Sequence, residues 1–290
     1  MNNSEKEGYA EHDFTDGDCV CGKKDPSIPT EGLEYTLNDD GESYSVKGIG
    51  TATDTDIVIA SEYNGKSVTS IQSYAFSRCS GLTSITIPDS VTSIEQGAFE
   101  NCSGLTSITI PDNVTSIGNF AFWGCSSLTS ITIPDSITSI GDRAFYNCSS
   151  LQYNEFDNAY YFGNSTNPYL ALITAKDTAI TSCTIHKNTK FIVGPVFAKC
   201  SSLTSITIPD GVTGISNYMF QDCSGLTSIV IPNSITSIGQ SAFYNCKGLT
   251  SITFNGTKAQ WNDIEKDYFW NSGTGNYIVH CTDGDIAKDN

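Results

Sequence analysis

The sequence predicts a repeat solenoid, in which one short structural unit is stacked on itself many times. A phrase of 23 residues recurs along the chain, and 290 residues suit an elongated array better than a single globular core. A phrase repeated at fixed length indicates a stacked unit rather than a catalytic site assembled once. The regular copies open at Leu82, Leu105, Leu128, Leu151, Ile180, Leu203, Leu226 and Leu249, and a looser copy precedes them from about residue 54.

Each unit begins with a predicted strand, "LTSITI". Ile85 and Ile87 alternate with Ser84 and Thr86, which is the pattern of a half-buried strand whose hydroxyls point outward. The Pro-Asp pair that follows ends the strand and turns the chain. Stacked copies of this strand form a parallel sheet along one side of the solenoid, with neighbouring strands ~4.8 Å apart.

The remainder of the unit is predicted to form the other side. "VTSI" is a second short extended arm that buries Val91 and Ile94, and "GAFENC" is a single helical or irregular turn that buries Phe99 and Cys102. One unit cannot bury these groups alone, whereas stacked neighbours can.

The repetition therefore predicts two buried columns of side chains. One is aromatic and consists of Phe76, Phe99, Phe122, Phe145, Phe197, Phe220 and Phe243. The other consists of Cys79, Cys102, Cys125, Cys148, Cys200, Cys223 and Cys246. We interpret these thiols as small buried hydrophobes, because metal sites use closely spaced cysteine pairs rather than one cysteine per repeat.

Three segments depart from the period. Between Leu151 and Ile180, the runs "AYYFG" and "YLALITA" flank "NSTNP", which predicts a β-hairpin inserted near 151–179, within or in place of part of one repeat. Capping elements are expected at both ends: a hairpin within "LEYTLNDDGESYSVKGIG", and a helix near Trp261 with a strand near Ile278. The predicted domains are a disordered or loosely ordered leader (1–30), an N-terminal β cap (31–53), the solenoid (54–254) and a C-terminal cap (255–290).

Repeats of "L-T-S-I-T-I-P" followed by "I-G", "A-F" and "C" over residues 54–254 resemble the BspA-like leucine-rich repeat proteins. The closing "GTKAQWNDI" is also similar to the end of that group. The resemblance implies a leucine-rich-repeat-like solenoid with a strand-lined concave face. It also implies a bacterial surface protein that attaches to host matrix proteins or to other cells.

The charge balance argues against several classes of partner. With 32 Asp plus Glu against 15 Lys plus Arg, the formal charge is −17, so binding to nucleic acid or to an anionic membrane surface is disfavoured. No apolar run approaches the ~20 residues needed to span a bilayer, so no membrane insertion is expected. The first residues do not read as a signal peptide, so either the protein is cytosolic or a signal was removed before Met1. The predicted location is extracellular or at the cell surface, with the signal removed.

Candidate chemistry in the sequence is sparse. His12, Cys19 and Cys21 lie near the start, but Cys-x-Cys is not zinc-knuckle spacing. His280 stands beside Cys281 without a nameable orienting partner, and His186 replaces the turn proline of its repeat. No hydrolase, phosphate-binding, metalloprotease or dinucleotide motif is present. We therefore predict no enzyme, no catalytic residue, no metal and no cofactor.

The predicted binding residues lie on the sheet face and on the inserted hairpin. Small hydroxyls suit a β-lattice and need no ligand, but the face is wide and nearly uncharged, and aromatics on irregular insertions are common binding anchors. The candidates are Ser84, Thr86, Ser107, Thr109, Ser130, Thr132, Thr184, Ser205, Thr207, Tyr160, Tyr161 and Tyr169.

The predicted function is a non-enzymatic binding module, surface-bound or secreted, whose partner is a host or cell-surface protein or a glycan. The alternative is a rigid spacer of a larger surface protein, with no ligand of its own. A third reading, ice binding by the hydroxyl lattice, conflicts with the expected curvature and with the break at residues 151–179. The pattern leaves the oligomeric state open.

Overall fold

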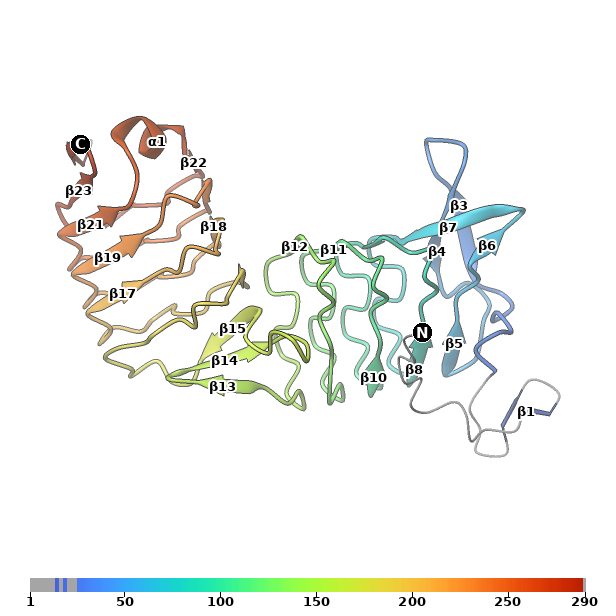
Figure 1. The fold of residues 1–290 in the computed structure, drawn as a ribbon. Coiled ribbons are helices and arrows are strands. Elements are labelled where there is room, and N and C mark those ends of the chain that lie inside the picture. Colours follow the sequence, from blue (N-terminus) through green and yellow to red (C-terminus); the bar gives the residue numbers. More distant parts are fainter. Residues whose placement is uncertain (1–13, 16–17, 20–24, 289–290) are drawn as a thin grey trace.

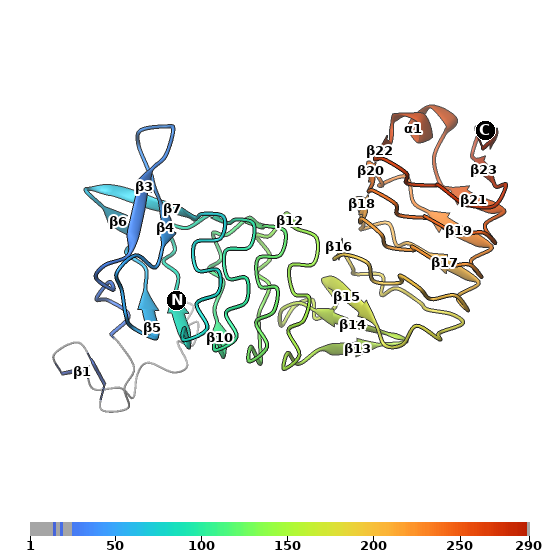
Figure 2. The same cartoon turned by 180° about the vertical axis from the view of Figure 1, so that it is seen from behind.

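Most regular repeats contribute two short strands, and each kind of strand pairs in parallel with its counterpart one repeat away. The computed structural model describes residues 14–15, 18–19 and 25–288. These form an elongated solenoid that bends near its middle (Figure 1), and the view from behind shows the same bend (Figure 2). We call residues 54–150 the first arm and residues 193–254 the second arm.

The "LTSITI" segments form what we call the outer ladder. In the first arm its strands are β5 (Asp56–Val58), β8 (Ser84–Thr86) and β10 (Ser107–Ile108). In the second arm they are β17 (Ser205–Thr207), β19 (Ser228–Ile231) and β21 (Ser251–Phe254). The register is repeat on repeat, so Ser107 lies opposite Ser84 and Ile108 opposite Ile85. The predicted parallel sheet is confirmed.

The "VTSI" segments form a second parallel ladder, which we call the inner ladder. Its first-arm strands are β7 (Lys66–Ile71), β9 (Ser93–Ile94), β11 (Ser116–Ile117) and β12 (Ser139–Ile140). Its second-arm strands are β18 (Gly214–Ile215) and β20 (Ser237–Ile238), and β22 (Glu265–Lys266) continues the ladder beyond that arm. The inner ladder, not the outer one, lines the hollow side of the bend (Figure 1). The resemblance implies a concave face lined by the "LTSITI" strands, whereas the hollow of this bend is lined by the "VTSI" strands.

A four-stranded sheet replaces one repeat between the two arms. It consists of β13 (Asn154–Phe156), β14 (Ala159–Phe162), β15 (Ala171–Ala175) and β16 (Phe191–Ile192). Strands β13, β14 and β15 pair antiparallel in that order, and β16 joins β15 in parallel. The predicted hairpin corresponds to β14 and β15, whereas β13 was not predicted.

The phenylalanines form two columns instead of the single column predicted. Phe76, Phe99, Phe122 and Phe145 stack with centroids 5.3–5.6 Å apart and interplanar angles of 3–10°. Phe145 then meets Phe162 of the hairpin edge to face, at 79°. Phe197, Phe220 and Phe243 form the second stack, which ends edge to face on Trp270 at 82°. The hairpin sheet separates the columns because it occupies the repeat that would have connected them.

The column cysteines are free thiols, and all except the partly buried Cys79 are buried. Five of them donate a hydrogen bond to the phenylalanine carbonyl of the preceding repeat, as from Cys102 Sγ to Phe76 O (3.0 Å) and from Cys223 Sγ to Phe197 O (2.9 Å). Cys200, which opens the second column, contacts Asp177 O at 3.9 Å instead. Burial raises the pKa of Cys102, Cys148 and Cys246 to about 12. The thiols therefore stay protonated and act as core donors, in agreement with the structural interpretation.

The turn before each phenylalanine uses the left-handed backbone region, whatever residue occupies it. The φ angle is 62° at Tyr74, 60° at Gly97 and 57° at Phe120. Such a conformation costs ~1–2 kcal/mol outside glycine. It persists because adjacent turns are tied together, for example by the Phe76 amide on Ala98 O at 2.8 Å.

Different elements close the two ends. At the start, β3 (Glu34–Leu37) and β4 (Tyr44–Gly48) form a hairpin that continues the inner ladder, and β6 (Glu62–Tyr63) pairs with β7. At the other end, α1 (Lys258–Asp263) and the antiparallel β23 (Ile278–Cys281) and β24 (Gly284–Ala287) follow the last repeat. Strands β1 (Phe14–Thr15) and β2 (Asp18–Cys19) pair within the predicted leader, most of which lies outside the described residues. The domain boundaries stay a prediction.

Candidate functional site

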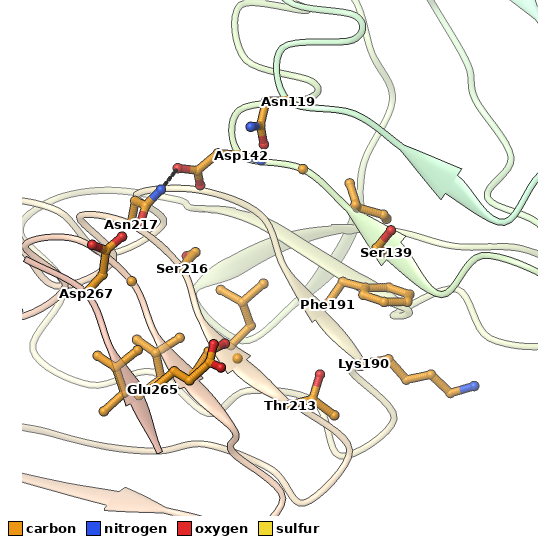
Figure 3. Close-up of a pocket in the computed structure, with 18 of the residues that line it drawn as sticks. Asn119, Ser139, Asp142, Lys190, Phe191, Thr213, Ser216, Asn217, Glu265 and Asp267 are labelled. Atoms are coloured by element: carbon orange, nitrogen blue, oxygen red, sulfur yellow. Dashed lines mark hydrogen bonds between the residues drawn. The ribbon is translucent and has the colours of Figure 1, made fainter. Parts of the chain in front are cut away.

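A hollow of about 620 Å³ lies on the inner side of the bend, between the two arms (Figure 3). The first arm contributes Asn119 and residues 138–142, and β16 contributes residues 190–192. The second arm contributes residues 213–217 and 237–239, and β22 with its following turn contributes residues 265–267. A second hollow of about 410 Å³ continues along the inner ladder of the first arm and shares Asn119 and Ser139 with the first.

The hollow exists because the inner ladder is interrupted at the hairpin repeat. Strand β12 pairs only with β11, β18 pairs only with β20, and β16 pairs with the hairpin instead of with β18. Within the second arm, the amides of Thr236 and Gly239 donate to carbonyls of the preceding strand at 2.8 Å each. In the described part of the chain, no strand accepts the corresponding amides of Thr213 and Ser216. Unpaired strand edges therefore face the hollow from both arms.

A hydrogen bond between side chains 75 residues apart closes the rim between the arms. Asn217 Nδ2 donates to Asp142 Oδ2 at 2.7 Å, and Figure 3 shows this contact above the hollow. Nearby, the Arg143 guanidinium lies 5.8 Å from the centroid of the Tyr218 ring. We call the Asp142–Asn217 pair the clasp.

Both asparagines at the rim are oriented by the next repeat. Asn119 Oδ1 accepts from the Asp142 amide, and Asn217 Oδ1 accepts from the Gln240 amide, each at 2.7 Å. Burial raises the pKa of Asp142, while the hydrogen bond from Asn217 and the charge of Arg143 oppose this rise. The clasp thus holds a partly buried carboxylate with one oxygen bonded and the other available to a ligand.

The centre of the hollow combines hydroxyls with one aromatic ring. Figure 3 shows Phe191 of β16 between Ser139 of the first arm and Thr213 of the second. Phe191 is partly buried, and its amide donates to Leu170 O at 3.2 Å, so the hairpin sheet holds the backbone beneath the ring. Ser139 and Thr213 are exposed.

The predicted hydroxyl residues lie on the outer ladder, away from this hollow. The structure divides them into two patches, one on the first arm and one on the second arm and the segment just before it, because the hairpin sheet interrupts the outer ladder as well. Neighbouring threonines hydrogen-bond between repeats, such as Thr106 Oγ1 to Thr83 O at 3.1 Å. Among the described residues, the hydroxyls of Thr109 and Thr132 have no such partner. The first patch contains Ser84, Thr86, Ser107, Thr109, Ser130 and Thr132; the second contains Thr184, Ser205 and Thr207.

The three hairpin tyrosines differ in accessibility. Tyr161 is fully buried, so its ring belongs to the core, and its prediction as a binding residue is corrected. Tyr160 is partly exposed and packs against Tyr153 at 5.2 Å. Tyr169 is partly buried against the ring of His186, 4.1 Å between centroids.

The other chemical candidates are not brought together into a site. His280 Nδ1 lies 2.9 Å from Asp285 Oδ1 on the exposed terminal hairpin. His12 and Cys21, and the side chain of Cys19, lie outside the described residues. Within those residues, no group of three His, Cys, Asp or Glu could hold a metal ion. The described chain also contains no helix long and apolar enough to cross a bilayer.

Sequence reasoning missed the hollow, although the repeat phrase carries a signal for it. At the position of "VTSI", the hairpin repeat reads "TKFI", so Lys190 and Phe191 replace the usual threonine and serine. The next repeat has Gly214 in place of that serine. Departures from the phrase on the inner ladder therefore cluster where the two arms meet.

Comparison with known proteins agrees with the repeat architecture. A family model described as the BspA type leucine rich repeat region matches residues 60–167 and 175–287, in 6 copies. A search among curated proteins finds no match.

Solved structures of bacterial leucine-rich repeat proteins are also similar. A protein of T. pallidum has 24% identity over 77% of this chain and 90% of its own, with a TM-score of 0.48. One from Bacteroides ovatus has 24% identity over 87% of this chain and 70% of its own, with a TM-score of 0.43. A leucine rich cell surface protein of Faecalibacterium prausnitzii has 24% identity over 82% and 97%, with a TM-score of 0.31.

Proposed function

Since the chain belongs to the family of BspA type leucine rich repeat proteins, we propose that it is a non-enzymatic binding module of a surface or secreted protein. Its ligand binds in the hollow on the inner side of the bend. The observation that supports this most is that residues from both arms and from the hairpin repeat converge there, at the point where the sequence departs from its repeated phrase.

In the regular repeats, most side chains and polar groups are used for stacking one repeat on the next. Their inward side chains are core, their thiols bond the preceding repeat, and many of their threonines bond the preceding strand, as Thr115 Oγ1 bonds Thr92 O at 3.2 Å. These groups are accounted for by stacking. The hollow instead offers free strand edges, amides, carboxylates and a partly exposed ring in a concave site, and its volume lies within the ~300–1,000 Å³ of typical ligand pockets.

A binding screen with face-specific variants tests this proposal. The full chain is screened against extracellular-matrix proteins and a glycan panel, beside Thr213→Arg, which fills the hollow. Thr109→Lys with Thr132→Lys tests the outer hydroxyl patch, and Tyr160→Ala with Tyr169→Ala tests the hairpin. Saturable binding that only Thr213→Arg abolishes, with an unchanged melting temperature, supports the hollow.

Loss of binding in the Thr109→Lys, Thr132→Lys variant alone moves the site to the outer ladder. Absence of binding to any probe favours the alternative, in which the solenoid is a rigid spacer within a larger surface protein.

A further inference from the structure

We propose that the hollow between the arms takes a short neutral oligosaccharide, with Phe191 as the platform for one sugar ring and the clasp as the group that binds its hydroxyls. This inference rests on the proposed function, because it names the ligand class of the same hollow.

The polar groups of the hollow match hydroxyls better than they match charged groups. A sugar hydroxyl both donates and accepts, so it can use the free oxygen of Asp142, the amide nitrogen of Asn119 and the hydroxyls of Ser139 and Thr213. Hydrogen bonds to the ionised carboxylate are the strong ones in such a set. Because Asn119 and Asn217 are already bonded to the next repeat, the donors and acceptors are held in place before a ligand arrives.

Phe191 supplies the apolar half of a sugar site. Among the residues that the structure describes, it is the only aromatic side chain that lines the hollow, and pairing of β16 with β15 fixes its backbone. An aromatic face carries partial negative charge, which attracts the weakly positive C–H groups on one face of a pyranose ring. A ring beside convergent hydroxyls, amides and a carboxylate therefore fits a ligand that is polar at its edges and apolar on one face.

Charge disfavours acidic ligands in this hollow. Asp142, Glu265 and Asp267 contribute three carboxylates to the lining. Lys266 Nζ donates to Trp261 O at 2.6 Å and to Ile264 O at 3.0 Å, so it is directed to its own backbone, and Lys190 is the remaining lysine of the lining. The chain as a whole carries −17. Sialylated or sulfated glycans would meet net repulsion here.

A peptide strand fits less well than a sugar. β-strand addition depends on main-chain hydrogen bonds along an exposed edge, and the two edges that face the hollow, β12 and β18, are 2 residues long each. The adjoining hollow of about 410 Å³ along β9 and β11 instead gives room for an oligosaccharide to extend beyond its first ring.

Titration calorimetry on the full chain with neutral oligosaccharides, their sialylated counterparts and extended peptides tests the ligand class. Phe191→Ala is expected to weaken binding of the neutral sugar by about tenfold or more, while Phe191→Trp retains it. Asp142→Asn removes the negative charge but keeps an oxygen that can accept the hydrogen bond from Asn217. It is therefore expected to weaken sugar binding while the clasp stays intact. Thr109→Lys, on the outer ladder, is the matched control and should bind as the wild type does.

The outcomes separate this inference from the proposed function. Neutral-sugar binding that Phe191→Ala and Asp142→Asn both reduce supports the inference. Binding of a peptide or of an enzymatically deglycosylated protein that Thr213→Arg abolishes overturns the carbohydrate assignment and leaves the hollow as a protein site. Ligand binding that is equal in the wild type, Phe191→Ala and Thr213→Arg overturns both.

Discussion

The two arms repeat the same phrase and build the same two ladders, yet they do not share a core. The first column stacks four phenylalanines and the second stacks three, and each ends on an aromatic ring turned by about 80°, Phe162 or Trp270. A parallel stack of rings continues only while each repeat presents the same ring in the same orientation. A single irregular repeat is therefore enough to end one core and start another.

The hairpin sheet (β13 to β16) separates these two cores, and we call it the wall. In β14, Tyr161 is buried in the second core and the adjacent Phe162 in the first. In β15, Ala171 is buried in the first core and the adjacent Leu172 in the second. Because successive side chains of a strand point to opposite faces, the sheet closes both cores at once. It also interrupts the inner ladder, and that interruption creates the hollow.

The sharpest test of this comparison places one cavity in each arm. Phe122→Ala and Phe220→Ala are each expected to destabilise the protein by ~3–5 kcal/mol, because each opens a hole in a packed column. Trp123 lies in the first arm, while Trp261 and Trp270 follow the second. Replacing Trp123 alone, or Trp261 and Trp270 together, leaves tryptophan fluorescence that reports on the unfolding of one arm in a denaturant melt. If the wall separates the arms, each variant lowers mainly the transition midpoint of its own arm.

If both variants lower the transition midpoint equally at Trp123 and at Trp261 and Trp270, the two arms unfold cooperatively as one unit, and the hairpin sheet does not separate them. Thr109→Ala, on the outer ladder, controls for substitution without a cavity.

A smaller effect is expected from removing one core thiol. Cys125→Ala loses the sulfur and its hydrogen bond to Phe99 O (3.1 Å), which should cost ~1–2 kcal/mol. Cys223→Ala should cost a similar amount in the second arm, because its contact to Phe197 O is equivalent. Urea melts compare the two. A loss in only one arm would indicate that the columns are not equivalent.

The clasp tests how the arms are held together. Asn217→Ala removes the hydrogen bond between the arms and also the bond from the Gln240 amide to Asn217 Oδ1, so it should destabilise the protein by ~1–3 kcal/mol. Asn119→Ala is the matched control: it loses the equivalent bond from the Asp142 amide to Asn119 Oδ1 (2.7 Å), which lies within the first arm. A loss no larger than that of the control would mean that the clasp does not hold the arms.

The pH dependence of stability tests the state of Asp142. Its pKa is raised in the folded protein by burial, so the folded state binds a proton more tightly than the unfolded chain. The contribution of Asp142 to stability is therefore largest below the unfolded pKa, near 3.8, and declines as the pH rises through the folded pKa. Urea midpoints measured from pH 3 to 7 should show that this decline is absent in Asp142→Asn. An unchanged profile in the variant would contradict the assignment.

The smallest expected change in stability distinguishes threonines that hydrogen-bond to the preceding repeat from threonines that do not. Thr115→Val breaks the hydrogen bond from Thr115 Oγ1 to Thr92 O and should cost ~0.5–1 kcal/mol. Thr109→Val touches no such bond and should change stability by less than ~0.5 kcal/mol. Thermal melts of the two variants under identical conditions make the comparison. Equal losses would mean that the hydroxyl ladder adds nothing beyond β-propensity.

The sequence alone determined the repeat unit, its inward residues and the position of the hairpin. Phe99, Cys102 and Ile94 recur at the same positions in every copy that carries the whole phrase, and this fixed spacing predicts which side chains are buried. The hairpin of β3 and β4 and the helix near Trp261 were also predictable from the sequence, because turns and helix caps depend on residues close together in the chain.

Only the tertiary structure decided which ladder faces the hollow, where the columns stop and why Asp142 meets Asn217. Each of these depends on how one repeat stacks on another across an irregular segment, and no periodic pattern encodes that relation. Tyr161 illustrates the limit: an aromatic residue in a hairpin can face solvent or core, and its neighbours in space, not in sequence, bury it. In the arms, each repeat makes the same contacts with its neighbour, so the repeated sequence is enough to predict them. The hollow forms where the hairpin sheet interrupts those contacts.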